Sequence, residues 1–136
     1  MSQIVRCGLI QVGNPINDES QPVSVIQQAM LEAHLPMIEE AAAKGVQILC
    51  LQEIFNGPYF CPGQDKRWYS AAEPIPNGPT TRLMQELAKK HSMVIVVPLY
   101  EEDMRGVYYN TAAVIDADGT YLGKYRKQHI PQTSGF

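Results

Sequence analysis

The chain has 136 residues, a formal net charge of -3 at pH 7, and 45% hydrophobic and 18% charged residues. This length and balance are typical of one globular domain with a substantial core. The acidic balance argues against nucleic-acid and anionic-membrane partners, since both need a basic surface, and it favours a small uncharged or zwitterionic partner.

No apolar run in the sequence approaches the roughly 20 residues that a membrane span needs, and the N-terminus lacks the basic and apolar regions of a secretory signal. We therefore expect a cytoplasmic protein. The 3 cysteines are an odd number without paired spacing, so the sequence predicts neither a disulfide framework nor a zinc site.

The first half of the chain predicts a strand, a helix and a second strand. Residues 4–12 are apolar almost throughout and predict a strand that is buried on both faces. Apolar residues recur at helical spacing over residues 23–44, with Ser20 as a candidate N-cap and a kink or break expected at Pro36. Residues 46–51 then predict a strand parallel to the first.

The middle of the chain predicts a loop, a helix and a strand. Residues 56–79 are rich in proline, glycine and aromatic side chains, with room for a short helical turn around residues 64–68. A loop of this length is typical of a lid or a binding segment, and a plain surface excursion is the alternative. Residues 79–91 predict an amphipathic helix, and the β-branched run 93–97 predicts a strand.

Two further strands, residues 107–115 and 120–126, flank a turn that contains Gly119 and are expected to pair as a hairpin. The resulting order predicts an α/β fold with about five strands in a mixed sheet. Both helices can cover one face of this sheet. The other face lacks cover, so we expect a partner layer from another chain or from residues outside this sequence.

Two polar segments end predicted strands. Glu53 follows an apolar run and precedes a Gly-Pro turn, and residues 123–131 carry three cations within four positions. Taken alone, each segment is more often a cap, a salt-bridge partner or a solvated edge than a catalytic site. Because adjacent strand ends lie within side-chain reach, a Glu and a Lys that meet there would shift each other's proton affinity and form an acid/base pair.

Four motifs in order carry a resemblance to a known family: Leu-Gln-Glu at 51–53, Gly-Pro-Tyr-Phe at 57–60, Tyr-Asn-Thr-Ala at 109–112 and Gly-Lys-Tyr-Arg-Lys-Gln-His-Ile-Pro at 123–131. Together they resemble the nitrilase, or carbon-nitrogen hydrolase, family. Within it they are most similar to the N-carbamoyl amide hydrolases, the group that includes the β-ureidopropionases and the N-carbamoylputrescine amidases. The resemblance implies that residues 1–136 are the N-terminal portion of one domain, half of a four-layer α-β-β-α sandwich.

The resemblance also implies a Glu-Lys-Cys site in which Glu53 is the general base and Lys127 stabilises the oxyanion. A thiol needs such a base to become a good nucleophile, and an ammonium group stabilises the developing negative oxygen. The family's nucleophilic cysteine and a further glutamate belong to later motifs that these residues do not contain. Strand alternation is expected to point Lys124 and Arg126 off the active face, although it does not separate Lys127 from Tyr125.

Three further residues are candidates for substrate binding: Tyr59, Phe60 and His129. Loop anchoring is the alternative for the two aromatic residues, and a structural hydrogen bond is the alternative for His129. Cys61 lies in the same loop but does not match the family's nucleophile motif, so we expect it to line the pocket or to be inert.

The remaining polar candidates are expected to be structural. Cys7 and Cys50 lie in predicted strands and are expected to be buried. His34 and His91 lie on predicted helices and are expected at the surface, whereas the side chain of Asn110 is expected to tie strand ends together.

The implied reaction is hydrolysis of the ureido C–N bond of an N-carbamoyl amine or β-amino acid, without a metal or another cofactor, in an enzyme that is at least a dimer. Two alternatives remain open: an N-carbamoylputrescine amidase, and a truncated, non-catalytic binding or assembly module. The 136 residues alone are expected to have little or no activity, because they lack the family's nucleophilic thiol, on which the base and the lysine would act.

Overall fold

The computed structural model describes residues 4–18 and 20–131, which form one mixed five-stranded sheet with two α-helices. The elements in order are β1 (Cys7–Leu9), α1 (Val23–Ala43), β2 (Ile48–Cys50), the 3₁₀ turns η1 (Cys61–Gly63) and η2 (Lys66–Ala71), α2 (Pro79–His91), β3 (Val94–Met104), β4 (Val107–Ile115) and β5 (Tyr121–Arg126). This order and the α/β class confirm the sequence-based prediction. No helix in the described ranges is long and apolar enough to cross a membrane.

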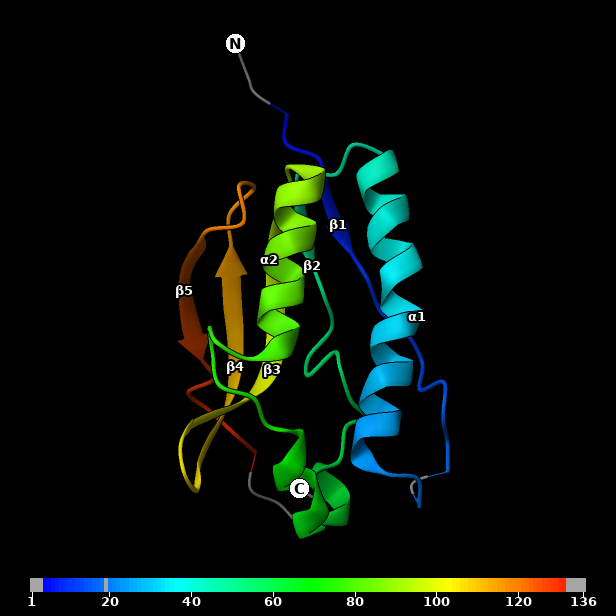
Figure 1. Cartoon of the computed structure of the whole chain (residues 1–136), viewed down its shortest axis with the longest axis vertical. Coiled ribbons are helices and arrows are strands. Elements are labelled where there is room, and N and C mark those ends of the chain that lie inside the picture. The colour runs from blue at the N-terminus through cyan, green and yellow to red at the C-terminus, as the bar shows by residue number, and fades with distance from the viewer. Residues whose placement is uncertain (1–3, 19, 132–136) are drawn as a thin grey trace.

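The strands lie side by side in sequence order (Figure 1). β1, β2 and β3 are parallel, and β3, β4 and β5 form an antiparallel meander. The predicted hairpin of β4 and β5 is confirmed, with Gly119 at φ 89° in its turn. Both β2 and β5 run toward the end of the sheet where the η1 and η2 turns lie (Figure 1).

The core lies between one face of the sheet and both helices. Leu49 is paired with Ile95, and Ile95 with Ile115, so these fully buried side chains share one face. Ile38 of α1 and Met84 of α2 pack into the same cluster. Both helices therefore cover a single face, as the sequence predicted.

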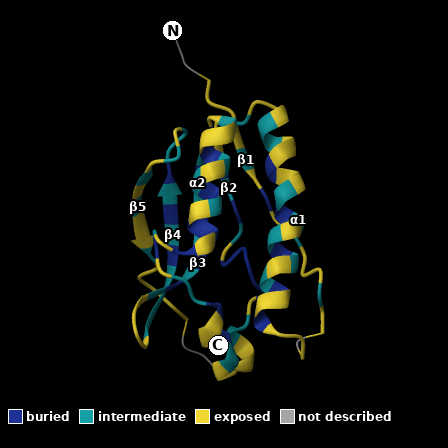
Figure 2. Ribbon diagram, in the orientation of Figure 1, coloured by how far each residue is buried: buried dark blue, intermediate teal, exposed yellow. Residues whose placement is uncertain are grey.

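The opposite face of the sheet is uncovered within the described residues. Leu9 and Ile48 lie on this face and are 85% and 37% exposed. In Figure 2 the ribbon of β1 is mostly in the exposed colour. The prediction that residues 4–12 form a strand buried on both faces is therefore wrong, because β1 is short, occupies the sheet edge and has only one covered face.

Other boundaries also differ from the predictions. α1 begins after Pro22 rather than Ser20, whose hydroxyl and backbone N–H both donate to Asp18, and the helix continues without a break through Pro36. β3 extends to Met104 because its second half pairs with β4. The predicted turn around residues 64–68 corresponds to η2.

Candidate active site

Glu53 lies in a turn that is tied to the central strand β3. The backbone N–H of Leu51 donates to Val96 O at 3.1 Å, and that of Phe55 donates to Pro98 O at 3.2 Å. Between them, Ile54 has a φ of 48°, a left-handed conformation that is a genuine outlier for a β-branched residue. Such strain persists only where the surroundings impose it, and it concentrates at functional sites.

A second anchor holds the loop that follows Glu53. Glu73 accepts hydrogen bonds from the backbone N–H and the hydroxyl of Thr80, at 2.9 and 2.6 Å, in the first turn of α2. Its Oε1 also accepts from Asn56 Nδ2 at 3.2 Å. One carboxylate therefore both caps α2 and fixes the buried residue Asn56, three positions after Glu53.

Lys127 is the first residue after β5, and the fold places it on Glu53. Lys127 Nζ donates to Glu53 Oε1 at 2.7 Å, across 74 positions of sequence. Asn110 Nδ2 donates to the same oxygen at 2.7 Å, and the backbone O of Asn110 accepts from Lys127 N at 2.8 Å. The Asn110 side chain therefore ties β4 to the segment that follows β2, as expected, and it does so by a direct contact with the Glu53 carboxylate.

Each charged partner favours the ionised form of the other. The hydrogen bond from Lys127, joined by one from Asn110, holds the pKa of Glu53 below its ordinary value against the opposing effect of partial burial. The hydrogen bond to Glu53 in turn raises the pKa of Lys127. At neutral pH the pair is thus a carboxylate that can accept a proton beside an ammonium group that can stabilise negative charge.

A cavity of about 230 Å³ opens beside this pair. Its lining residues are Glu53, Ile54, Tyr59, Phe60, Cys61, Tyr100, Tyr108, Tyr109, Asn110, Lys127, Ile130 and Pro131. Tyr59 and Phe60, two of the three predicted binding residues, are among them. The third, His129, is exposed and lies outside this lining, and its role stays a prediction.

Aromatic side chains form one wall of the cavity. Phe60 stacks on Trp68 with ring centroids 5.4 Å apart and lies 5.1 Å from the ring of Tyr100. A neighbouring hollow of about 410 Å³ shares Phe60, Cys61 and Tyr100 with this wall. Both the pocket-lining role and the anchoring role of Phe60 are thus compatible with its contacts.

The cysteine predictions are partly wrong. Cys7 is exposed and Cys50 is half-buried, because both lie on the uncovered face of the sheet. Cys61 is half-buried and lines the cavity.

The histidine predictions also need correction. His34 is fully buried between α1 and the Glu53 turn, with Nδ1 2.7 Å from Met30 O and its ring 5.0 Å from that of Phe55. His91 retains only 12% side-chain exposure beside Glu39. Helical position alone did not reveal these tertiary contacts.

A larger hollow, of about 450 Å³, lies between β1 and α1. Two of its charged residues, Glu40 and Lys44, form an exposed ion pair one helical turn apart on α1. An acid and a base from separate segments do not meet in this pair. Within residues 4–18 and 20–131, no group of three or more His, Cys, Asp or Glu side chains could hold a metal ion. The Glu53–Lys127 cavity is therefore the candidate site.

Solved structures define the class of fold. The chain is similar to a carbon-nitrogen hydrolase from Helicobacter pylori G27, with a TM-score of 0.79 and 26% identity over 93% of this chain and 40% of the other. It is also similar to Saccharomyces cerevisiae Nit3, a member of branch 10 of the nitrilase superfamily, with a TM-score of 0.66 and 26% identity over 80% and 40% of the two chains. The sheet and its helix layer thus correspond to one half of the nitrilase-like sandwich.

Sequence comparisons agree with this class. The model of the carbon-nitrogen hydrolase family matches residues 9–136. A beta-ureidopropionase of Arabidopsis thaliana is 40% identical over 98% of this chain, and an N-carbamoylputrescine amidase of the same plant is 47% identical over 74% of it. The chain belongs to the carbon-nitrogen hydrolase family, and it spans 33% of the length of each of these two relatives.

Proposed function

We propose that this chain supplies the general base and the oxyanion-stabilising cation of a cysteine-dependent enzyme that hydrolyses N-carbamoyl amines or N-carbamoyl β-amino acids. Glu53 is the base and Lys127 is the cation. The nucleophilic thiol comes from residues outside this sequence. The observation that carries the proposal is the 2.7 Å contact between Lys127 Nζ and Glu53 Oε1 at the mouth of the cavity.

In the proposed reaction Glu53 takes the thiol proton as the sulfur attacks the ureido carbon. Lys127 stabilises the negative oxygen of the tetrahedral intermediate, which collapses with loss of one nitrogen as an amine or ammonia. Glu53 returns its proton to that leaving nitrogen. Water then hydrolyses the carbamoyl thioester, which restores the thiol and releases a carbamic acid. The carbamic acid decomposes to carbon dioxide and the remaining nitrogen compound, so the overall products are ammonia, carbon dioxide and the amine.

The division of roles is supported by the charges of the pair. A carboxylate whose pKa is lowered is ionised at neutral pH, and is therefore ready to accept a proton. An ammonium whose pKa is raised stays charged through the same range. Asn110 and Lys127 both donate to Oε1 of Glu53, and we propose that the second carboxylate oxygen accepts the thiol proton.

The substrate class is supported by the relatives named beta-ureidopropionase and N-carbamoylputrescine amidase. Their substrates share the ureido group and differ in the charge of the tail. Tyr59 and Phe60 are proposed to line the pocket for this substrate, and His129 to lie close to it. We also propose that the active enzyme is a homo-oligomer without a cofactor.

The test is ammonia release from N-carbamoyl-β-alanine and N-carbamoylputrescine by the full-length protein that carries this chain. Glu53→Gln is expected to lower kcat by about 10² to 10⁴-fold, and Lys127→Met by about 10² to 10³-fold. The surface pair Glu39 and Lys90, which also meet at 2.7 Å, provides matched controls. Glu39→Gln and Lys90→Met are expected to change kcat less than about twofold, as for other exposed ion pairs.

Two outcomes would contradict the proposal. If Glu53→Gln and Lys127→Met hydrolyse the substrates as fast as the control variants do, the pair is not catalytic. If the unmodified full-length protein binds both substrates without releasing ammonia, the non-catalytic binding module is correct instead.

A further inference from the structure

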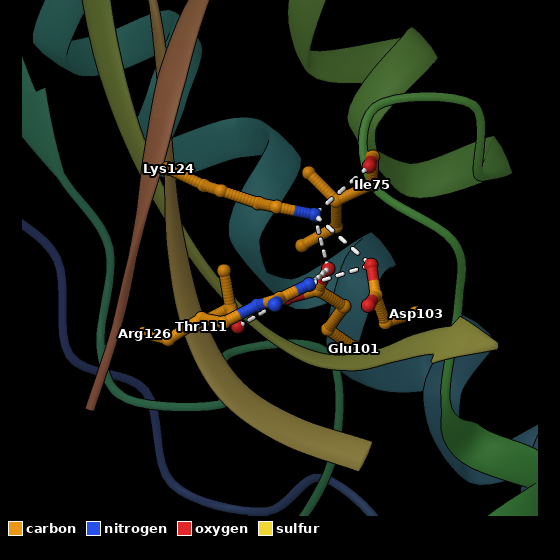
Figure 3. Close-up of polar contacts among 6 residues, drawn as sticks. All are labelled: Ile75, Glu101, Asp103, Thr111, Lys124 and Arg126. Carbon is orange, nitrogen blue, oxygen red and sulfur yellow. Dashed lines mark hydrogen bonds and ion pairs between the residues drawn. The ribbon is translucent and has the colours of Figure 1, made fainter. Parts of the chain in front are cut away.

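A second cluster of charged side chains surrounds Glu101 of β3, whose own side chain is fully buried (Figure 3). Arg126 donates to both of its carboxylate oxygens, from Nη2 to Oε1 at 2.7 Å and from Nε to Oε2 at 3.0 Å. Lys124 Nζ also donates to Oε1, and the hydroxyl of Thr111 donates to Oε2 at 2.6 Å. At the rim, Asp103 accepts from Arg126 at 2.6 Å and lies 3.8 Å from Lys124 Nζ.

The ionised form of Glu101 depends on these partners. Burial alone would raise the pKa of Glu101, but hydrogen bonds from Arg126, Lys124 and Thr111 bring it down to about 2. Both cations come from β5, whereas Glu101 lies on β3, with β4 between them. The carboxylate therefore ties the edge strand to the centre of the sheet across an intervening strand.

The ladder that pairs β5 with β4 contains one irregularity, ahead of the residues that contact Glu101. The β4–β5 ladder is irregular between Val114 and Ile115, where Leu122 has no partner residue. Beyond this point, Arg126 pairs with Thr111 and Lys124 with Ala113, on the helix-covered face of the sheet. A slip of one residue would exchange the two faces for every side chain that follows the bulge.

Lys127 comes directly after the clamped residue Arg126 and points to the opposite face. Its backbone N–H continues the ladder to Asn110 O at 2.8 Å, and its Nζ reaches Glu53. A one-residue slip would move Lys127 toward the helix-covered face and would break the contact with Glu53. The alternation of Lys124 and Arg126 away from the active face, which the sequence predicted, is confirmed by their contacts.

We propose that Glu101 is a positioning residue for Lys127. By holding Lys124 and Arg126 on the helix-covered face, it sets the register of β5 beyond the bulge and so delivers the next side chain, Lys127, to Glu53. The inference rests on the proposed function for the role of Lys127 in catalysis, but the positioning itself can be measured without turnover.

The test is Glu101→Gln in the full-length protein. We expect kcat for the N-carbamoyl substrates to fall about 10- to 100-fold, the range expected for a catalytic group misplaced by about 1 Å, with KM changed less than about threefold. The pKa of Lys127, followed by NMR of its side chain, is expected to fall toward the ordinary lysine value because the contact with Glu53 is lost.

Asp103→Asn is the matched control. It removes a carboxylate that contacts the same Arg126 but is 34% exposed at the side chain. We expect kcat within about twofold of the unmodified protein, as for other exposed pairs, and an unchanged Lys127 titration. A purely stabilising role of Glu101 would lower activity only through the folded fraction and would leave the Lys127 pKa of the folded protein unchanged.

If Glu101→Gln does not fold, Arg126→Lys is the alternative variant for the test, because it keeps the positive charge but loses the bidentate contact with Glu101. The same fall in the Lys127 pKa is expected. An unchanged Lys127 titration in a folded variant would overturn the inference. If the unmodified protein hydrolyses neither substrate, the proposed function fails, and the NMR titration still decides whether Glu101 positions Lys127.

Discussion

Removing the Asn110 side chain isolates one hydrogen bond of the candidate site. In Asn110→Ala, the 2.7 Å donation from Nδ2 to Glu53 Oε1 is lost, whereas the backbone bond between Lys127 N and Asn110 O remains. The contact between Lys127 and Glu53 keeps its backbone support. The variant therefore removes one donor from the carboxylate without detaching the end of β5.

The magnitude follows from the charge and exposure of the acceptor. A hydrogen bond to a charged group contributes about 1.5 to 3 kcal/mol. The side chain of Glu53 is 47% exposed, so water can replace part of the lost hydrogen bonding. We therefore expect removal of the Asn110 side chain to cost about 1 to 1.5 kcal/mol. That loss corresponds to roughly 5- to 10-fold in kcat/KM if the bond acts in the transition state.

The pH dependence has a definite sign. Asn110 helps to lower the pKa of Glu53, so its removal raises that pKa. Activity that needs ionised Glu53 is then lost at a higher pH on the acidic side of the profile. Carboxyl-carbon NMR of Glu53 and kcat/KM between about pH 2 and pH 8, an interval that extends below the ordinary carboxyl pKa of about 4, measure both effects.

Gln85→Ala is the matched control, since its amide donates to Gly119 O at 2.9 Å in the β4–β5 turn, away from the cavity. It is expected to leave the Glu53 titration unchanged. If Asn110→Ala leaves the Glu53 pKa unchanged or lowers it, the assigned hydrogen bond does not act on the carboxylate.

Three other predictions concern stability and Cys61. A Cβ at Gly78 would lie 2.6 Å from Pro74 O and 2.8 Å from the carboxylate of Glu73, so Gly78→Ala is expected to lower the free energy of unfolding by about 1 to 3 kcal/mol in urea denaturation; an unchanged midpoint would contradict this close contact. Burial lowers the pKa of His34 below its ordinary value of 6.5, so the unfolded chain binds the proton more readily and stability should fall as pH drops from 6.5 toward the folded value. His34→Leu should abolish this pH dependence in denaturation midpoints, and an undiminished slope would assign it elsewhere. When the 136-residue chain alone is incubated with an N-carbamoyl substrate, mass spectrometry is expected to find no covalent adduct, and an adduct on Cys61 would overturn its assignment as a cavity-lining residue.

Local patterns predicted most of the fold but failed at its edges. Residues 4–12 are apolar on both faces although one face of the sheet is uncovered within the described residues, and apolarity alone does not reveal which face has a cover. His34 has the sequence surroundings of a surface residue, yet the return of the Glu53 turn beneath α1 buries it beside Phe55. Helical periodicity predicts which side of a helix is apolar, but it does not predict which distant segment of the chain packs against the helix.

The sequence by itself determined the order of the elements, the single-sided helix layer, the β4–β5 hairpin and the two segments that carry Glu53 and Lys127. It could do so because hydrophobic period, turn residues and strand alternation act over short distances. Only the tertiary structure decided that Lys127 meets Glu53, that Asn110 joins them, and that Glu101 holds the strand next to Lys127. These side-chain contacts join positions 23 to 74 residues apart, and strand pairing across the sheet sets their geometry.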